Sequence, residues 1–100
     1  MGFEVVFRDD SLEKIEAERQ HRGGYPAGIC KIFRRRMQLI RSANDKRDFY
    51  ALKSLHFEKL KGKRQHQYSM RLNDQWRLVL EIETVGNKKI LTVCTIEDYH

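Results

Sequence analysis

The fold is decided by the stretch Gln67-Tyr68-Ser69-Met70-Arg71-Leu72-Asn73-Asp74-Gln75-Trp76-Arg77-Leu78-Val79-Leu80-Glu81-Ile82. Apolar and polar residues alternate along both halves, which is typical of β-strands that bury one face. Asn and Asp between the halves favour a turn. If Leu72 and Trp76 both face the core, the loop is Asn73-Asp74-Gln75. The stretch then predicts a β-hairpin in which Arg71 lies directly opposite Arg77.

The next hairpin follows from the same alternation. A loop around residues 85–88 leads into the apolar run 90–96. Antiparallel pairing across this loop predicts three neighbouring pairs: Ile82 with Ile90, Trp76 with Ile96, and Arg77 with Thr95. Thr95, Glu97 and Tyr99 are then expected on the face that carries the two arginines.

The residues before the hairpins predict one strand and two to three helices. Residues 3–7 read as a strand, and Asp10 with Glu13 resembles a capping box that starts a helix. Pro26 opens a second helix that runs to about Arg41, and residues 45–55 form a short helix or turn. The apolar face of the second helix consists of Ile29, Phe33, Met37 and Ile40.

Together these elements predict an α+β domain. Their order is β-α-α-β-β-β, with two to three helices packed on one face of a mostly antiparallel sheet. The alternation predicts one shared core that contains Trp76, Leu78, Met70, Phe33 and Met37.

Composition limits the class of protein. One hundred residues make a single domain, 1–100, and a net charge of +6 favours a polyanionic partner. No apolar run approaches the length of a membrane helix. Cys30 and Cys94 lie in apolar segments and are expected to be buried free thiols, which suits a reducing cytoplasm. The four histidines show no zinc-motif spacing, so we expect no metal or cofactor.

Basic residues gather in two places. The segment 59–66 is dense in basic residues, of which Lys59, Lys63 and Arg64 are candidates for contact with RNA. Arg34 and Arg35 belong to an arginine run on the predicted second helix. Three interpretations of that run stay open: a nucleic-acid patch, a solvated helix face, and a docking face for an acidic partner.

The last three residues, Asp98-Tyr99-His100, can each hold or move a proton. They are either a tail that packs and is solvated or an acid/base group at the rim of the sheet. The predicted register gives one cationic, helix-free face, which is either a solvated basic surface or a candidate site for phosphodiester chemistry. Its residues are Lys61, Arg71, Arg77 and Tyr99, with His100 and His56 at the rim.

Three segments carry a resemblance to a known family. Residues 60–64, 68–78 and 96–100 resemble the toxins of the RelE/ParE superfamily, and most closely the HigB-like "killer" toxins of type II toxin–antitoxin loci. The resemblance implies a RelE-like fold and a ribosome-dependent mRNA endonuclease that inhibits translation. It implies that Lys61 and Arg77 hold the scissile phosphate and that Arg71 assists. Asp98, Tyr99 and His100 would orient the nucleotide and supply acid/base function.

The resemblance also implies partners and alternatives. The partners are a helix-turn-helix, HigA-like antitoxin, the 70S ribosome and mRNA, with DNA contacted only through the antitoxin complex and no membrane. One alternative is a ParE-like toxin that targets gyrase, but the terminal Asp-Tyr-His favours the ribonuclease. The other is a non-enzymatic basic RNA-binding module. It predicts stacking aromatics on the exposed sheet face, whereas Tyr68 and Trp76 are in phase with the apolar residues.

Overall fold

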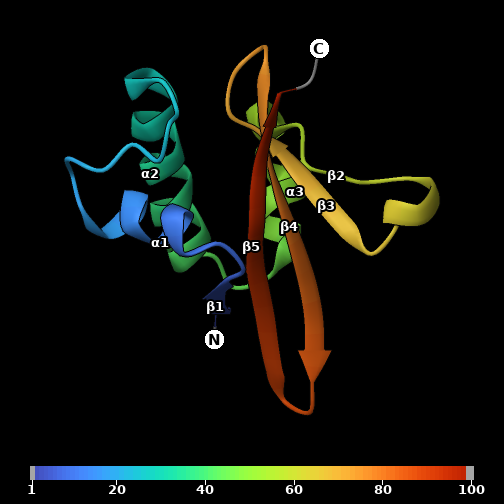
Figure 1. The fold of residues 1–100 in the computed structure, drawn as a ribbon. Helices are drawn as coiled ribbons and strands as arrows, with labels where there is room; N and C mark the ends of the chain where they lie inside the picture. The colour runs from blue at the N-terminus through green and yellow to red at the C-terminus, as the bar shows by residue number, and fades with distance from the viewer. Residues whose placement is uncertain (1, 99–100) are drawn as a thin grey trace.

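The computed structural model describes residues 2–98 and has helices packed on a five-stranded sheet (Figure 1). The predicted α+β class is confirmed. The 3₁₀ helices η1 and η2 and the two-residue strand β2 add to the predicted order. The described elements are β1 (Glu4–Phe7), α1 (Asp10–Ala17), α2 (Ala27–Ser42), α3 (Lys46–Ala51), η1 (Lys53–Leu55), β2 (Glu58–Lys59), η2 (Gly62–Arg64), β3 (Gln67–Arg71), β4 (Trp76–Val85) and β5 (Lys88–Asp98).

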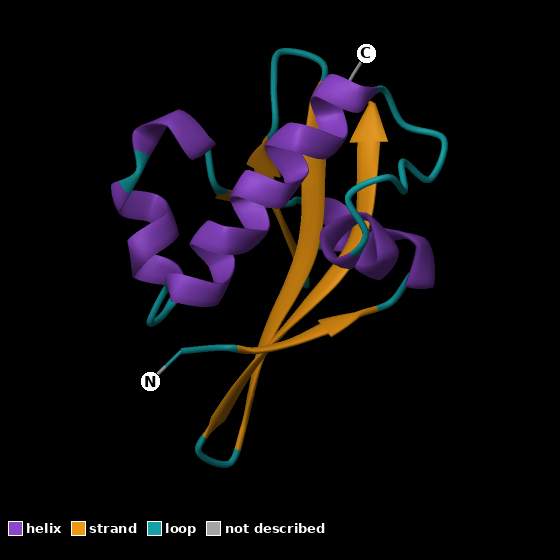
Figure 2. Cartoon of the chain, turned by 90° about the vertical axis from the view of Figure 1, so that its left-hand side faces the viewer, coloured by secondary structure: helices purple, strands orange, loops and turns teal. Residues whose placement is uncertain are grey.

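The strand order is β1-β5-β4-β3-β2. The strand β1 runs parallel to β5, and the other neighbours are antiparallel, as a mostly antiparallel sheet requires. The helix α2 lies across one face of the sheet (Figure 2). The far end of the β4–β5 hairpin projects beyond the helices (Figure 1). Within residues 2–98, no helix combines the length and the apolar character that a membrane crossing requires.

The first helix begins one residue earlier than predicted. Its N-cap is Asp9, whose side chain accepts a hydrogen bond of 2.8 Å from the backbone N–H of Ser11. Asp9 has an extended backbone, as an N-cap requires, whereas Asp10 is already helical. The expected capping role of Asp10 is therefore wrong. In α2 the prediction is confirmed, since Pro26 precedes the helix and its apolar residues are buried.

The core forms between α2 and the helix-facing side of the sheet. The side chains of Phe33, Met37, Met70 and Leu78 are fully buried in one cluster. Trp76 packs on the edge of this cluster, with its ring perpendicular to that of Tyr25 at 5.9 Å. The predicted shared core is confirmed, and it turns Arg71 and Arg77 to the other face of the sheet.

The register of the first hairpin is confirmed, because Arg71 pairs with Arg77. The register of the second hairpin is wrong by one to two residues. The observed pairs are Ile82 with Leu91, Trp76 with Asp98, and Arg77 with Glu97. A β-bulge explains the extra shift, because Val79 pairs with Thr95 and Leu80 with Val93, which leaves Cys94 unpaired between them. Thr95 and Glu97 still lie on the arginine face.

Candidate functional site

Arg77 is fixed at the centre of the candidate site. Its Nε donates a hydrogen bond of 2.9 Å to the Ser69 hydroxyl, and Nη2 donates one of 2.5 Å to the backbone carbonyl of His56. Ser69 is fully buried, and the Arg77 side chain is only 12% exposed. The guanidinium is therefore held in one orientation before any ligand arrives, which favours electrostatic stabilisation of a developing negative charge.

His56 has an unusual backbone. It follows η1 with φ 44° and ψ 47°, and it is the one non-glycine residue with positive φ among residues 2–98. This left-handed conformation is strained for a side chain with a Cβ, and such strain gathers at functional sites. It directs the His56 carbonyl to Arg77, while Nε2 of the ring lies 3.5 Å from Nη1 of Arg71.

Arg71 lies across the ladder from Arg77 and forms an ion pair with Asp74 in the hairpin loop. The loop itself is shaped by Asn73, whose side-chain oxygen accepts hydrogen bonds from the backbone N–H groups of Gln75 and Trp76. An open cleft of about 250 Å³ results. Its lining residues are His56, Arg71, Asn73, Asp74 and Arg77.

Glu58 joins this cleft to a second hollow. Its carboxylate lies 3.7 Å from Nη2 of Arg77, and it also lines a space of about 310 Å³ with Lys59, Leu60 and Lys61. The predicted site residues His56, Arg71 and Arg77 thus share one cleft. Lys61 lines the second hollow instead, and it follows Leu60, which donates its N–H to the Gln67 carbonyl at the start of β3. Glu58, Asp74 and Ser69 were missed from the sequence. Of these three, only Glu58 could have been found from the sequence, because its carboxylate immediately precedes the basic segment.

Asp98 ends β5 beside the same hairpin loop. Its Oδ2 accepts a hydrogen bond of 2.9 Å from the Gln75 side chain, and it pairs with Trp76 across the ladder. Tyr99 and His100 lie outside the described residues.

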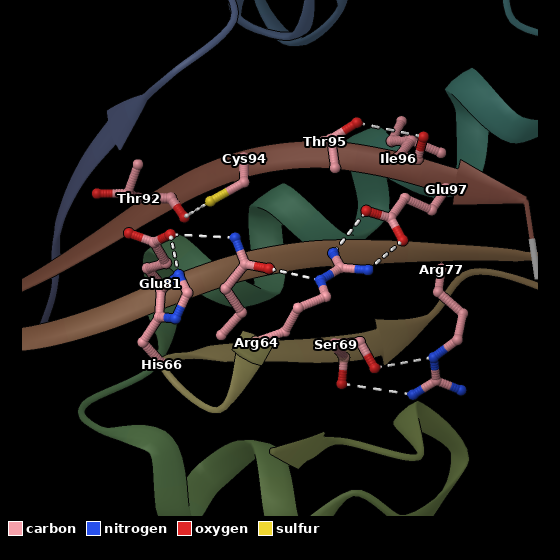
Figure 3. Close-up of polar contacts among 11 residues, drawn as sticks. Arg64, His66, Ser69, Arg77, Glu81, Thr92, Cys94, Thr95, Ile96 and Glu97 are labelled. Atoms are coloured by element: carbon pink, nitrogen blue, oxygen red, sulfur yellow. Dashed lines mark hydrogen bonds and ion pairs between the residues drawn. The ribbon is translucent and has the colours of Figure 1, made fainter. Parts of the chain in front are cut away.

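The rest of the helix-free face is more acidic and more covered than expected. Figure 3 shows Arg64 reaching over the sheet to Glu97, with two hydrogen bonds of 3.0 and 2.6 Å. Further along, Glu81 accepts hydrogen bonds from Arg8 and Gln67 and lies 3.5 Å from His66. The expected cationic face therefore also carries two glutamates on β4 and β5, and basic residues from the segment before β3 lie against them.

The basic residues predicted to contact RNA lie in different environments. Lys59 and Lys63 are exposed, on β2 and η2, whereas Arg64 forms an ion pair with Glu97. Arg34 is built into the fold: it donates hydrogen bonds to the backbone carbonyls of Ile15, Glu18, Arg19 and His21. Arg35 is exposed on α2. A continuous basic surface that includes Arg34 is therefore not present.

The two cysteines are free and buried, as predicted. Burial, together with the nearby Glu81, raises the pKa of the Cys94 thiol to about 11, which makes it a poor nucleophile. Within the described part of the chain, no group of three or more His, Cys, Asp or Glu residues is placed to hold a metal ion.

The fold is that of the RelE-like toxins. A YoeB/ParE toxin from Agrobacterium tumefaciens superposes with a TM-score of 0.64 at 17% identity, over 98% of this chain and 100% of that one. YoeB in a YoeB–YefM complex from Staphylococcus aureus gives a TM-score of 0.59 at 19% identity, over 100% and 99%. A YoeB dimer from the same organism gives 0.55 at 19% identity, with the same coverage.

The sequence identifies the family of the chain more specifically than the fold does. The family described as "RelE-like toxin of type II toxin-antitoxin system HigB" matches residues 5–100, and the chain belongs to this HigB-like toxin family. The resemblance noted in the sequence is confirmed. A search of curated proteins found no match to the chain.

Proposed function

We propose that this toxin is a ribosome-dependent mRNA endonuclease that inhibits translation. The observation that supports the proposal best is the cleft where Arg71 faces Arg77, with His56 and Glu58 against the same guanidinium groups. Two cations beside groups that can transfer protons are what cleavage of a phosphodiester requires.

In the proposed reaction the 2′-hydroxyl of the RNA attacks the neighbouring phosphorus. A base removes the proton of the 2′-hydroxyl as the O2′–P bond forms, and an acid protonates the 5′-oxygen as the P–O5′ bond breaks. The products are a 2′,3′-cyclic phosphate and a 5′-hydroxyl. Arg77, with Arg71 and Lys61, would hold the phosphate and stabilise the charge that develops on it. Glu58 and His56 are candidate bases, and Asp98, Tyr99 and His100 are candidates for orienting the nucleotide and for the acid.

The proposed partners follow from the family. We propose a helix-turn-helix antitoxin that neutralises the toxin, with DNA contacted only through the toxin–antitoxin complex. The S. aureus YoeB–YefM complex is an example of a relative with this fold bound to a second protein. The exposed Lys59 and Lys63 would contact ribosomal or messenger RNA. A ribosome substrate and two free thiols both suit a cytoplasmic location.

The test is a reconstituted translation reaction with purified toxin, ribosomes and a defined mRNA. We expect cuts within codons in the ribosomal A site, 5′-hydroxyl ends at the cuts, and no cleavage of the same mRNA without ribosomes. Intact mRNA in stalled, toxin-bound ribosomes would contradict the proposal. Inhibition of DNA supercoiling by gyrase, with intact mRNA, would instead identify a gyrase-targeting toxin.

A further inference from the structure

The third arginine of the Arg34-Arg35-Arg36 run connects α2 to the candidate site. The Arg36 side chain is half-buried, and its Nε donates a hydrogen bond of 3.0 Å to the backbone carbonyl of Arg71. Its two neighbours differ: Arg34 donates hydrogen bonds to backbone carbonyls at the end of α1 and just after it, and Arg35 is exposed.

The Arg71 carbonyl needs such a partner. Leu72 already donates its N–H to the Trp76 carbonyl, so the alternation of an antiparallel ladder turns the carbonyl of Arg71 away from β4. On the other side of β3, the strand β2 pairs only with Ser69 and Tyr68. Without Arg36, this carbonyl at the end of β3 would have no strand to pair with, and buried carbonyls are costly to leave unpaired.

The charge of Arg36 is unfavourable where it lies. Burial lowers the pKa of Arg36, and the nearby Arg35 and Arg71 lower this pKa further. An arginine nevertheless stays protonated at neutral pH. A half-buried third cation beside Arg71 is therefore a cost to the folded state, and it is offset when an anion enters the cleft.

We propose that Arg36 is a positioning residue, which fixes the peptide plane of Arg71 so that its guanidinium faces the phosphate held by Arg77. This inference rests on the proposed RNA cleavage. Arg36 would act through Arg71, from the opposite face of the sheet, and would not touch the RNA.

The test compares Arg36→Gln with Arg35→Gln, which removes the same charge from the neighbouring exposed position. Cleavage of ribosome-bound mRNA is measured in a single turnover at increasing toxin concentration. We expect Arg36→Gln to lower the rate at saturation about 10- to 100-fold, as small misplacements of a binding group do. The half-saturating concentration should stay within about twofold, since only Arg71 is displaced. Arg35→Gln should leave the saturating rate unchanged, and a contact of Arg35 with RNA would change only the half-saturating concentration.

A double-mutant cycle separates positioning from general stability. In an Arg71→Ala background, Arg36→Gln should cause no further loss of rate, because the residue through which it acts is gone. The conservative Arg36→Lys, which keeps the charge and a donor, should fall between the wild type and Arg36→Gln, and it replaces that variant in the cycle if Arg36→Gln does not fold. Equal saturating rates for Arg36→Gln and the wild type, or independent losses in the Arg71→Ala background, would overturn the inference.

A structural measurement keeps this test independent of the proposed function. The NMR signal of the Arg71 side-chain Nε–H should move in Arg36→Gln and not in Arg35→Gln. A wild-type protein that does not cleave mRNA would end the proposed function, and an unmoved Arg71 signal would end the positioning role whatever the activity.

Discussion

Arg71 and Arg77 lie directly opposite each other on β3 and β4, and each is accompanied by a carboxylate of its own. Asp74 pairs with Arg71, and Glu58 lies 3.7 Å from Arg77. Opposed like charges destabilise a ladder, so these acids explain how the free protein tolerates the pair. Both carboxylates are largely exposed, at 95% and 56%. Exposed ion pairs contribute little, so an incoming phosphate can replace them at small cost.

Replacing Arg77 by Ala should remove toxicity. The loss of one fixed donor to a transition state typically lowers the rate about 10²–10³-fold. Stability should also fall, by about 1–3 kcal/mol, because the buried Ser69 hydroxyl loses its partner. The measurements are growth after induction, primer-extension mapping of mRNA cuts, and thermal unfolding. The exposed Arg35→Ala is the control for lost charge. A folded Arg77→Ala protein that cuts mRNA at the wild-type rate would exclude the phosphate role.

Glu58→Gln and His56→Ala distinguish the two candidate bases. Removing the true base should lower the saturating cleavage rate about 10²–10⁴-fold with little change in binding to ribosomes. The variant in which the true base is still present should show the wild-type dependence of the cleavage rate on pH. Ala keeps a Cβ and therefore the strained backbone conformation of His56, so the thermal unfolding of His56→Ala must be measured in parallel. Wild-type rates for both variants would exclude both residues as the base.

The half-buried Trp76 and the fully buried Phe33 predict a graded loss of stability. Phe33→Ala should lower the free energy of unfolding by about 3–5 kcal/mol, and Trp76→Ala by less, because its ring lies at the edge of the core. Denaturant unfolding monitored by circular dichroism checks the order. A larger loss for Trp76→Ala would mean that its contact with Tyr25 contributes more than its position suggests.

The hairpin that ends in Trp76 could be predicted from the sequence because alternation determines faces directly. The predicted pairing of Arg71 with Arg77 is confirmed, and so is the predicted set of core residues on the helix-facing side. The register of β4 on β5 could not be predicted, since the bulge at Cys94 carries no glycine or other local signal. Alternation alone counts residues evenly and misses such an insertion.

The surroundings of individual charged side chains could not be predicted from the sequence either. The three consecutive arginines have three different surroundings. Arg34 contacts backbone carbonyls at the end of α1 and just after it, Arg35 is in solvent, and Arg36 contacts the carbonyl of Arg71. The alternation places Glu81 and Glu97 on the same face as the arginines, but the segment that covers them comes from a distant part of the chain. Such contacts join residues that are far apart in the chain, so no local sequence pattern predicts them.

Glu81 makes the covered part of the sheet sensitive to acid. Burial raises the pKa of Glu81, but the hydrogen bonds from Arg8 and Gln67, with the charges of Arg8 and His66, leave the pKa below its ordinary value of 4.5. The ionised form is therefore favoured in the folded protein. Its contribution to stability is complete above about pH 5 and is lost as the pH falls through the lower folded-state pKa.

The comparison of Glu81→Gln with the wild type checks this sign. The difference in free energy of unfolding should be largest near neutral pH and should shrink as the pH falls through the lowered pKa of Glu81, because the protonated carboxyl is neutral like the Gln side chain. The control is Glu83→Gln, two residues further along β4 and exposed. A difference that grows as the pH falls would contradict the assigned direction. His66, Arg8 and Cys94 surround Glu81, so His66→Gln should be measured alongside it.

The last prediction concerns the residues that follow Asp98. If Tyr99 or His100 takes part in proton transfer, a protein that ends at Asp98 should lose mRNA cleavage on translating ribosomes. Its fold should remain, since Asp98 keeps its hydrogen bond to Gln75 and its place opposite Trp76. Binding to ribosomes should also remain and should weaken with salt, because it arises from many lysines and arginines. Removing His100 alone should cost less than Arg77→Ala, since water or Tyr99 can partly replace an acid or base. Primer-extension mapping after induction of each form is the measurement. Undiminished cleavage by the protein ending at Asp98 would assign the chemistry to Glu58, His56 and the cations alone.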